Sequence, residues 1–287
     1  MAENPYWVRL DREVVSVTGP EAGPYLQGQL SQDVAGLAAG SSAWSWLLAP
    51  NGKVDALLRV SALSGGDWLL DTDAGWGEAV LARLQRFKLR TRADLDLVAA
   101  TVVGLRGAGW EALAAGCAPR ATAVPPWPGL EGADLLFVDG GPPPLPAGSE
   151  MPAADYEAVR IRAGQPRMGP ELGERTIPGE TGLVPFTVSF TKGCYTGQEL
   201  VARIDSRGGN VPRHLCRLRL DGEVPPGTDL LDGETVVGTV TSAADLAPSG
   251  TGAGWVGLGY VKRGFEGPRT LSAGRPGRAA QVEALPW

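Results

Sequence analysis

The chain has 287 residues, of which 43% are hydrophobic and 20% charged, a globular composition with enough length for two or three ordinary cores. Its net charge of −6 argues against binding to a phosphate backbone as the main task, because such binding needs a basic surface. The single histidine, His214, excludes multi-histidine metal sites. We therefore expect neither a nucleic-acid partner nor a resident metal.

Cysteine usage and the first residues indicate the compartment. Cys117, Cys194 and Cys216 are widely spaced and form no C-x-x-C pair, which argues against a disulfide framework or a zinc ribbon. Residues 1–7 show no basic segment followed by an apolar one, and no later run approaches membrane-spanning length. We therefore expect a cytoplasmic monomer without a membrane partner.

The N-terminal part of the chain alternates between apolar strands and amphipathic helices. The pattern predicts helices at 20–30 and 78–88, and strands at 14–19, 45–49, 54–60, 67–71 and 95–105. Asn51-Gly52, between the second and third strands, is typical of a hairpin turn. This order indicates an α+β fold with ferredoxin-like halves rather than a doubly wound sheet.

The later part changes from mixed to all-β texture. Helices are predicted at 110–115 and 154–162, and a strand at 135–138. Residues 164–190 keep no period and are rich in Gly and Pro, which favours a binding loop. Short strands after Pro212 predict a small β-barrel. A G-x-G-x-x-G pattern at 252–257 precedes a strand rather than a helix, so we interpret it as hairpin glycines.

Reactive side chains concentrate in residues 191–203. Thr196 and Glu199 have the T-x-x-E spacing of a capping box, which predicts a helix starting near Gly197. Cys194 would lie beside the positive end of that helix and two residues from Lys192, and both features favour the thiolate. Local chemistry leaves two readings open: a reactive thiol, or a buried and inert cysteine beside a well-capped helix.

Lys192-Gly193-Cys194-Tyr195-x-Gly197-Gln198-Glu199 resembles the signature octapeptide of the YgfZ-type folate-binding proteins, which are paralogues of the glycine cleavage T-protein. Further likeness lies in residues 19–34, 156–166, 180–183 and 202–208, although Gln165 and Ser206 depart from the family pattern. The resemblance implies a T-protein-like α+β fold. Two interleaved ferredoxin-like units would form a folate-binding region over 1–208, and a C-terminal β-barrel would span 209–287.

The resemblance also implies a function. It suggests a tetrahydrofolate-binding accessory protein that supports assembly or repair of iron–sulfur enzymes, with folate and those enzymes or their assembly factors as partners. Two alternatives stay open. One is a folate-dependent aminomethyltransferase or other one-carbon transferase, and the other is a client-docking module with a vestigial pocket.

Site residues follow from the same likeness. Asp55 matches the catalytic aspartate of T-proteins through an ungapped alignment at Gly52, although an exposed-face carboxylate is the simpler reading of a strand acid. Glu180 resembles the loop glutamate that contacts the pterin. Arg160 and Arg203 could bind the glutamate tail of folate or form surface ion pairs. Within the octapeptide, Cys194 is the expected reactive group, and the expected cofactor-binding residues are Lys192, Tyr195, Gln198 and Glu199.

Overall fold

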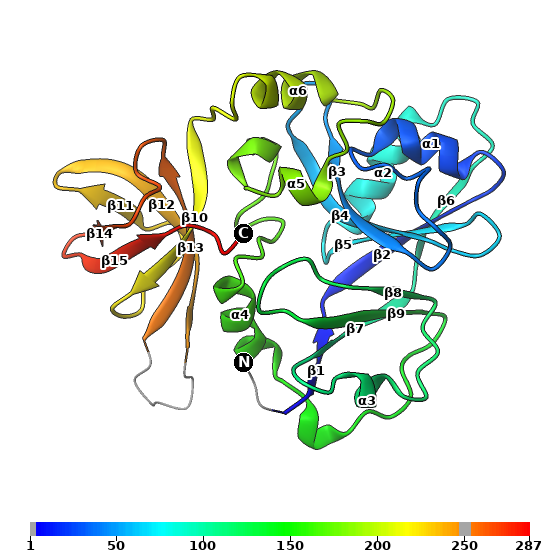
Figure 1. Cartoon of the computed structure of the whole chain (residues 1–287), viewed down its shortest axis with the longest axis horizontal. Helices are drawn as coiled ribbons and strands as arrows, with labels where there is room; N and C mark the ends of the chain where they lie inside the picture. The colour runs from blue at the N-terminus through cyan, green and yellow to red at the C-terminus, as the bar shows by residue number, and fades with distance from the viewer. Residues whose placement is uncertain (1–3, 247–253) are drawn as a thin grey trace.

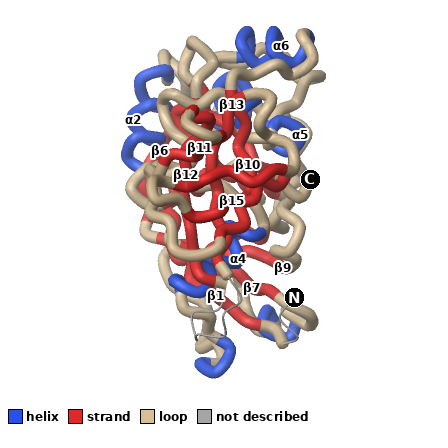
Figure 2. The backbone as a smooth tube through the Cα atoms, turned by 90° about the vertical axis from the view of Figure 1, so that its left-hand side faces the viewer, coloured by secondary structure: helices blue, strands red, loops and turns tan. Residues whose placement is uncertain are grey.

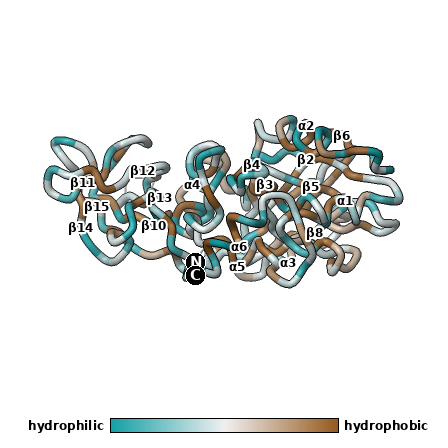
Figure 3. The backbone as a smooth tube through the Cα atoms, turned by 90° about the horizontal axis from the view of Figure 1, so that it is seen from above, coloured by the Kyte–Doolittle hydropathy of each residue, from teal (hydrophilic) through white to brown (hydrophobic). Residues whose placement is uncertain are grey.

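The computed structural model describes residues 4–246 and 254–287, which form two antiparallel sheets and a closed barrel. In Figure 1 the barrel occupies one side of the molecule and the two sheets the other, with helix α4 (Ala153–Arg162) between them. Figure 3, from above, shows the same order, with hydrophobic segments concentrated in the strands of both parts. The predicted α+β architecture with a C-terminal barrel is confirmed.

The five-stranded sheet has the order β3-β4-β5-β2-β6. Its helices pack on one face, where Val17, Leu58, Leu70 and Leu84 belong to one buried cluster. The strands are β2 (Arg12–Thr18), β3 (Ser42–Leu48), β4 (Val54–Ala62), β5 (Trp68–Asp73) and β6 (Asp94–Val98), and the helices are α1 (Ala22–Gln29) and α2 (Gly77–Phe87). The predicted hairpin between β3 and β4 is confirmed, with Gly52 at φ 80°.

The four-stranded sheet has the order β1-β7-β9-β8. One face packs with short helix α3 (Glu111–Ala114), and the other meets the five-stranded sheet, where Val102 and Leu136 join Val14 and Leu69 in one cluster. The strands are β1 (Tyr6–Leu10), β7 (Ala100–Arg106), β8 (Ala121–Ala123) and β9 (Gly132–Val138).

One predicted strand is wrong. Residues 95–105 form two strands, because the chain leaves β6 at Val98 and begins β7 at Ala100. Strand β6 pairs with β2 in the five-stranded sheet, whereas β7 pairs with β1 and β9 in the other. Apolar residues continue through the junction, so the residue pattern gives no sign that the chain changes sheets there.

Buried charges also join the two sheets. Arg59 Nε lies 2.8 Å from Asp71 Oδ2, and Arg59 also contacts Asp134 at 2.6 Å. Asp134 receives a second bond of 2.6 Å from Arg106. Burial alone would raise the pKa of Asp134, but Arg106 and Arg59 hold that pKa below its ordinary value. The sheets are thus joined to one another by buried ion pairs as well as by apolar packing.

The barrel has the closed order β10-β13-β12-β11-β14-β15, which is turned toward the viewer in Figure 2. Leu218, Leu230, Val240 and Val261 lie in its apolar core. The strands are β10 (Arg213–Leu220), β11 (Asp229–Asp232), β12 (Thr235–Asp245), β13 (Trp255–Lys262), β14 (Arg269–Ala273) and β15 (Arg278–Glu283). Of the G-x-G-x-x-G residues, 252 and 253 lie outside the described residues, and the remainder enters β13.

The segment between α4 and the barrel is irregular, as predicted. It contains only the short helical turns η2 (Pro178–Glu180) and α5 (Val184–Thr187) before helix α6 (Gln198–Ser206). A further short turn, η1 (Ala147–Ser149), precedes α4. Within residues 4–246 and 254–287, no helix combines the length and apolar character needed to cross a membrane.

Candidate functional site

A cavity of about 680 Å³ lies between residues 169–176 and the barrel strands β10, β12 and β13, and we call it the barrel cleft. The charged side chains that line it are Glu171, Glu174, Arg175, Arg213 and Lys262. Its volume is that of a typical small-molecule site. Both acceptors and cations are therefore available around one space of suitable size.

Arg160 does not line the barrel cleft, but it contacts Glu171, which does, and it has no free donors. Its guanidinium donates to Glu157, to the Gln165 carbonyl at 2.6 Å, to Glu171 Oε2 at 3.2 Å and to Ser242 Oγ at 3.1 Å. Counted by nitrogen, these contacts use all five N–H donors of an arginine. Arg160 is 3% exposed, and its contacts tie α4 and residues 169–176, which we call the cleft loop, to barrel strand β12.

Glu180 is buried and paired. Its Oε2 lies 3.1 Å from the guanidinium of Arg213, and the Arg213 guanidinium carbon lies 4.1 Å from the centre of the Tyr260 ring. Both Arg213 and Tyr260 line the barrel cleft, whereas Glu180 does not. The carboxylate thus orients a cleft cation from behind, an arrangement that sequence reasoning did not foresee because Arg213 is distant in the chain.

Asp55 occupies a β-bulge. Leu47 pairs with Ala56 and Leu48 with Val54, which leaves Asp55 as the extra residue. A bulge re-aims its side chain, and here the carboxylate meets Arg83 of α2 at 2.9 Å. Burial raises the pKa of Asp55 and the nearby Glu174 raises it further, whereas Arg83 lowers it. Asp55 is therefore a half-buried, ion-paired acid at a bulge rather than an exposed acid on a regular strand.

The bulge lies next to the cleft loop. The Val54 amide donates to the Thr176 carbonyl at 3.0 Å, and Glu174, which lines the cleft, is close enough to act on Asp55 electrostatically. Arg83 also donates to the Leu48 carbonyl at 2.8 Å. Asp55, Arg160 and Glu180, chosen from separate parts of the sequence, thus all contact or adjoin the elements that build the barrel cleft.

The octapeptide forms a separate region on the surface. Lys192 Nζ donates to the carbonyls of Gln27, Leu30 and Gln32 at 2.7, 2.6 and 2.8 Å, and it lies 5.2 Å from the centre of the Tyr195 ring. None of the eight residues lines the barrel cleft. The structure therefore separates Asp55, Arg160 and Glu180 from the octapeptide, residues 192–199, which we call the thiol loop.

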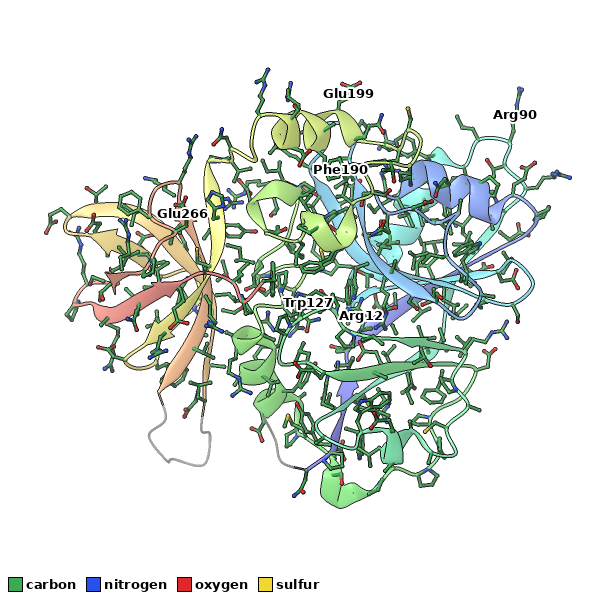
Figure 4. The ribbon with its side chains drawn as sticks, viewed as in Figure 1. Arg12, Arg90, Trp127, Phe190, Glu199 and Glu266 are labelled. Carbon is green, nitrogen blue, oxygen red and sulfur yellow. The ribbon has the colours of Figure 1, made fainter. Side chains whose placement is uncertain are left out.

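Cys194 is exposed and unpaired, so the reading of a buried cysteine is wrong. The other two cysteines differ from it: Cys117 is half-buried, and burial raises the pKa of Cys216 to about 12. Glu199 and Arg203 also lie exposed on α6, and neither forms an ion pair within the described part of the chain. Figure 4 shows Glu199 at the outer surface of this helix.

The predicted helix start is confirmed, but the predicted capping box is wrong. Gly197, in the left-handed conformation at φ 83°, is the N-cap of α6, and no side chain caps the helix. Instead, Gln198 Oε1 accepts the Tyr195 amide at 3.1 Å. Val201 docks the helix in the core, 4% exposed. A glycine supplies the entry turn that the Thr196 hydroxyl was expected to stabilise.

A second, smaller cavity of about 100 Å³ lies between the two sheets and is lined by Arg12, Trp44, Arg106 and Asp134 among others. Figure 4 shows Arg12 and Trp127 at this junction, and Trp127 meets the Trp44 ring edge-on at 4.6 Å. The charges here pair with one another, and the cavity is far smaller than the barrel cleft. Of the predicted site residues, Arg160 lines this smaller cavity, whereas none lines the barrel cleft itself. Sequence reasoning missed Arg12, Trp44, Arg106 and Asp134 because they come from four different strands.

Comparison with known proteins decides the family. No protein-family model matches the chain. The tRNA-modifying protein YgfZ of Edwardsiella ictaluri is 30% identical over 266 residues, which cover 82% of this chain and 79% of that protein. The chain belongs to the YgfZ family. This YgfZ-type chain is also 28% identical over 310 residues to the mitochondrial iron-sulfur cluster assembly factor IBA57 of Mus musculus, covering 97% and 84% of the two chains.

A solved structure confirms the fold of the YgfZ-type chain. Glycine cleavage system aminomethyltransferase T from Bartonella henselae superposes with a TM-score of 0.81, covering 98% of this chain and 86% of that one. At 20% identity this likeness concerns the fold alone. The T-protein-like architecture expected from the octapeptide is therefore present over nearly the whole chain.

Proposed function

We propose that this YgfZ-type protein binds tetrahydrofolate in the barrel cleft and acts as a cytoplasmic accessory protein in the assembly or repair of iron–sulfur enzymes. One observation carries the folate proposal: Arg160, Glu180 and Asp55 each act on a different residue that lines the cavity of about 680 Å³, namely Glu171, Arg213 and Glu174. The names of its relatives, tRNA-modifying protein YgfZ and iron-sulfur cluster assembly factor IBA57, support the accessory role.

The chemistry of the cleft suits a folate. The pterin carries N–H donors along one edge, and Glu174 offers carboxylate acceptors to such an edge. The glutamate tail carries carboxylates, which the cations Arg175, Arg213 and Lys262 would hold. Tyr260 supplies an aromatic surface beside Arg213. When bound, the reduced folate would supply one-carbon chemistry, and the residues above would bind and orient it.

The exposed thiol of Cys194 supports a second part of the function. Because Cys194 lies outside the cleft, folate binding and thiol chemistry use different surfaces of the chain. The sulfur of an exposed cysteine can reach iron or a cysteine on a partner protein. We expect the thiol loop to meet iron–sulfur enzymes or their assembly factors, while the cleft holds the cofactor.

Anaerobic calorimetric titration with tetrahydrofolate tests the cleft. Wild type should bind tetrahydrofolate. Arg213→Met should bind it at least about 10-fold more weakly, since a carboxylate of the folate tail that loses its partner in the cleft costs about 1–3 kcal/mol. Arg219→Met is the matched control, because Arg219 lies on the same strand, β10, but outside the cleft. Cys194→Ala should bind as wild type does. Absence of binding by folded wild type would overturn the proposal.

Complementation tests the accessory role. In a bacterial strain that lacks its own YgfZ-type protein, wild type should restore the activity of iron–sulfur enzymes. Cys194→Ala should fail to do so while still binding tetrahydrofolate in the titration. If Cys194→Ala restores activity fully, the thiol loop has no part in the function.

A further inference from the structure

Lys192 belongs to the octapeptide, yet its ammonium points into the protein. The three carbonyls that accept from Nζ belong to Gln27, Leu30 and Gln32, at the end of α1 and in the segment that follows it. Burial lowers the pKa of Lys192 to about 8, with Asp33 opposing that change, so the amine is mostly protonated at neutral pH. Three N–H donors thus meet three acceptors.

The receiving segment is itself rigidly held, so it can act as a fixed support. Gln27 Oε1 accepts the amides of Val34 and Ala35, and Gln27 Nε2 donates to Asp33. The Ser31 amide donates to the Trp46 carbonyl of β3 at 3.1 Å. The backbone that carries these carbonyls is therefore also held by contacts that do not involve Lys192.

The loop around Lys192 makes further contacts with the same segment. The Thr196 amide donates to the Gly28 carbonyl at 3.1 Å, and the Ser189 amide donates to the Ser31 carbonyl at 3.0 Å. Between these anchors, Phe190 is 51% exposed and Cys194 is exposed. The inward contacts of Lys192 and Thr196 thus leave the thiol on the outside of the loop.

We propose that Lys192 is the positioning residue of the thiol loop, its ammonium binding three carbonyls of residues 27–32 so that Cys194 faces outward toward a partner protein. Lys192 acts on Cys194 through the backbone of the loop and does not touch the cofactor in the barrel cleft. This inference deepens the thiol-loop part of the proposed function, but its test needs neither folate nor an iron–sulfur partner.

Chemical rescue tests whether the N–H donors of Lys192, rather than the volume of its side chain, hold the loop. In Lys192→Ala, amide hydrogen exchange in residues 192–200 should become at least about 10-fold faster, whereas exchange in the barrel should not change. The rate of Cys194 alkylation, followed by peptide mass spectrometry, should change in the same variant in which exchange of the loop amides changes. Methylammonium has the N–H donors that the carbonyls need and should restore slow exchange, whereas tetramethylammonium has the same charge without N–H and should not.

Lys53→Ala is the matched control, because it removes the same charge and Lys53 lies in the neighbouring β3–β4 turn. It should leave loop exchange and Cys194 alkylation as in wild type. Unchanged exchange in Lys192→Ala, or equal rescue by both cations, would overturn the proposal. Loss of tetrahydrofolate binding alone would instead concern the barrel cleft, so the two proposals fail separately.

Discussion

Gly197→Ala should weaken the attachment of the octapeptide to the five-stranded sheet. Gly197 has φ 83°, and a Cβ there would lie 2.6 Å from the Ala49 carbonyl oxygen and 2.8 Å from Leu48 Cβ. The left-handed conformation costs an alanine about 1–2 kcal/mol. Overpacking against a hairpin backbone adds about 1–3 kcal/mol. We therefore expect a loss of about 2–5 kcal/mol in the free energy of unfolding, or detachment of the loop.

Gly193→Ala is the internal control for this prediction. Gly193 lies in the same octapeptide, but its φ is not left-handed and a Cβ there would meet nothing within 4 Å. Urea unfolding measures the global free energy, and hydrogen exchange in residues 192–200 detects local detachment. The reasoning is refuted if Gly197→Ala stays within about 0.5 kcal/mol of wild type with unchanged exchange, or if both variants are equally affected.

Three further predictions concern the charged groups Asp134, Asp55 and Lys192. Asp134→Asn should lower the free energy of unfolding by about 3–5 kcal/mol in urea denaturation, because Arg59 and Arg106 lose a buried counter-ion, whereas the exposed Asp96→Asn should have little effect. Burial raises the pKa of Asp55 above its ordinary 3.8, so wild type should lose stability relative to Asp55→Asn as pH rises through the folded-state pKa. Because Arg83 lowers the pKa of Asp55, Arg83→Met should raise that pKa further in an NMR titration. Lys192 has a pKa of about 8 when folded and 10.5 ordinarily, so wild type should gain stability over Lys192→Met between those values, by at most about 1.4 kcal/mol per pH unit, in denaturation at several pH values. A flat pH dependence of that difference would contradict the burial of the ammonium.

Local signals in the sequence predicted local structure well. Asn51-Gly52 predicted a turn because only a left-handed residue closes it, and Gly52 has φ 80°. Helix α6 begins where expected, but the T-x-x-E spacing suggested the wrong cap, since Gly197 already turns the chain. The change of sheet after Val98 could not be seen, because alternation of apolar residues does not say which neighbour a strand pairs with.

The sequence suggested candidate site residues but not the contacts that they make. Likeness to a family selected Asp55, Arg160, Glu180 and the octapeptide, yet their partners lie far away in the chain. Arg83 reaches Asp55 across a bulge, and Arg213 reaches Glu180 from the barrel. Likewise, the three carbonyls that hold Lys192 are about 160 residues upstream. Such contacts depend on tertiary packing, which a single sequence does not encode in its local pattern.

A crystal structure of the complex with tetrahydrofolate tests the central claim most directly. We predict density for the ligand in the barrel cleft, with its tail beside Arg213 or Lys262 and Cys194 free at the surface. Density between the two sheets beside Trp44 and Arg106, in the cavity of about 100 Å³, would contradict the assignment of the cleft. Density against the octapeptide would contradict the separation of cofactor site and thiol loop.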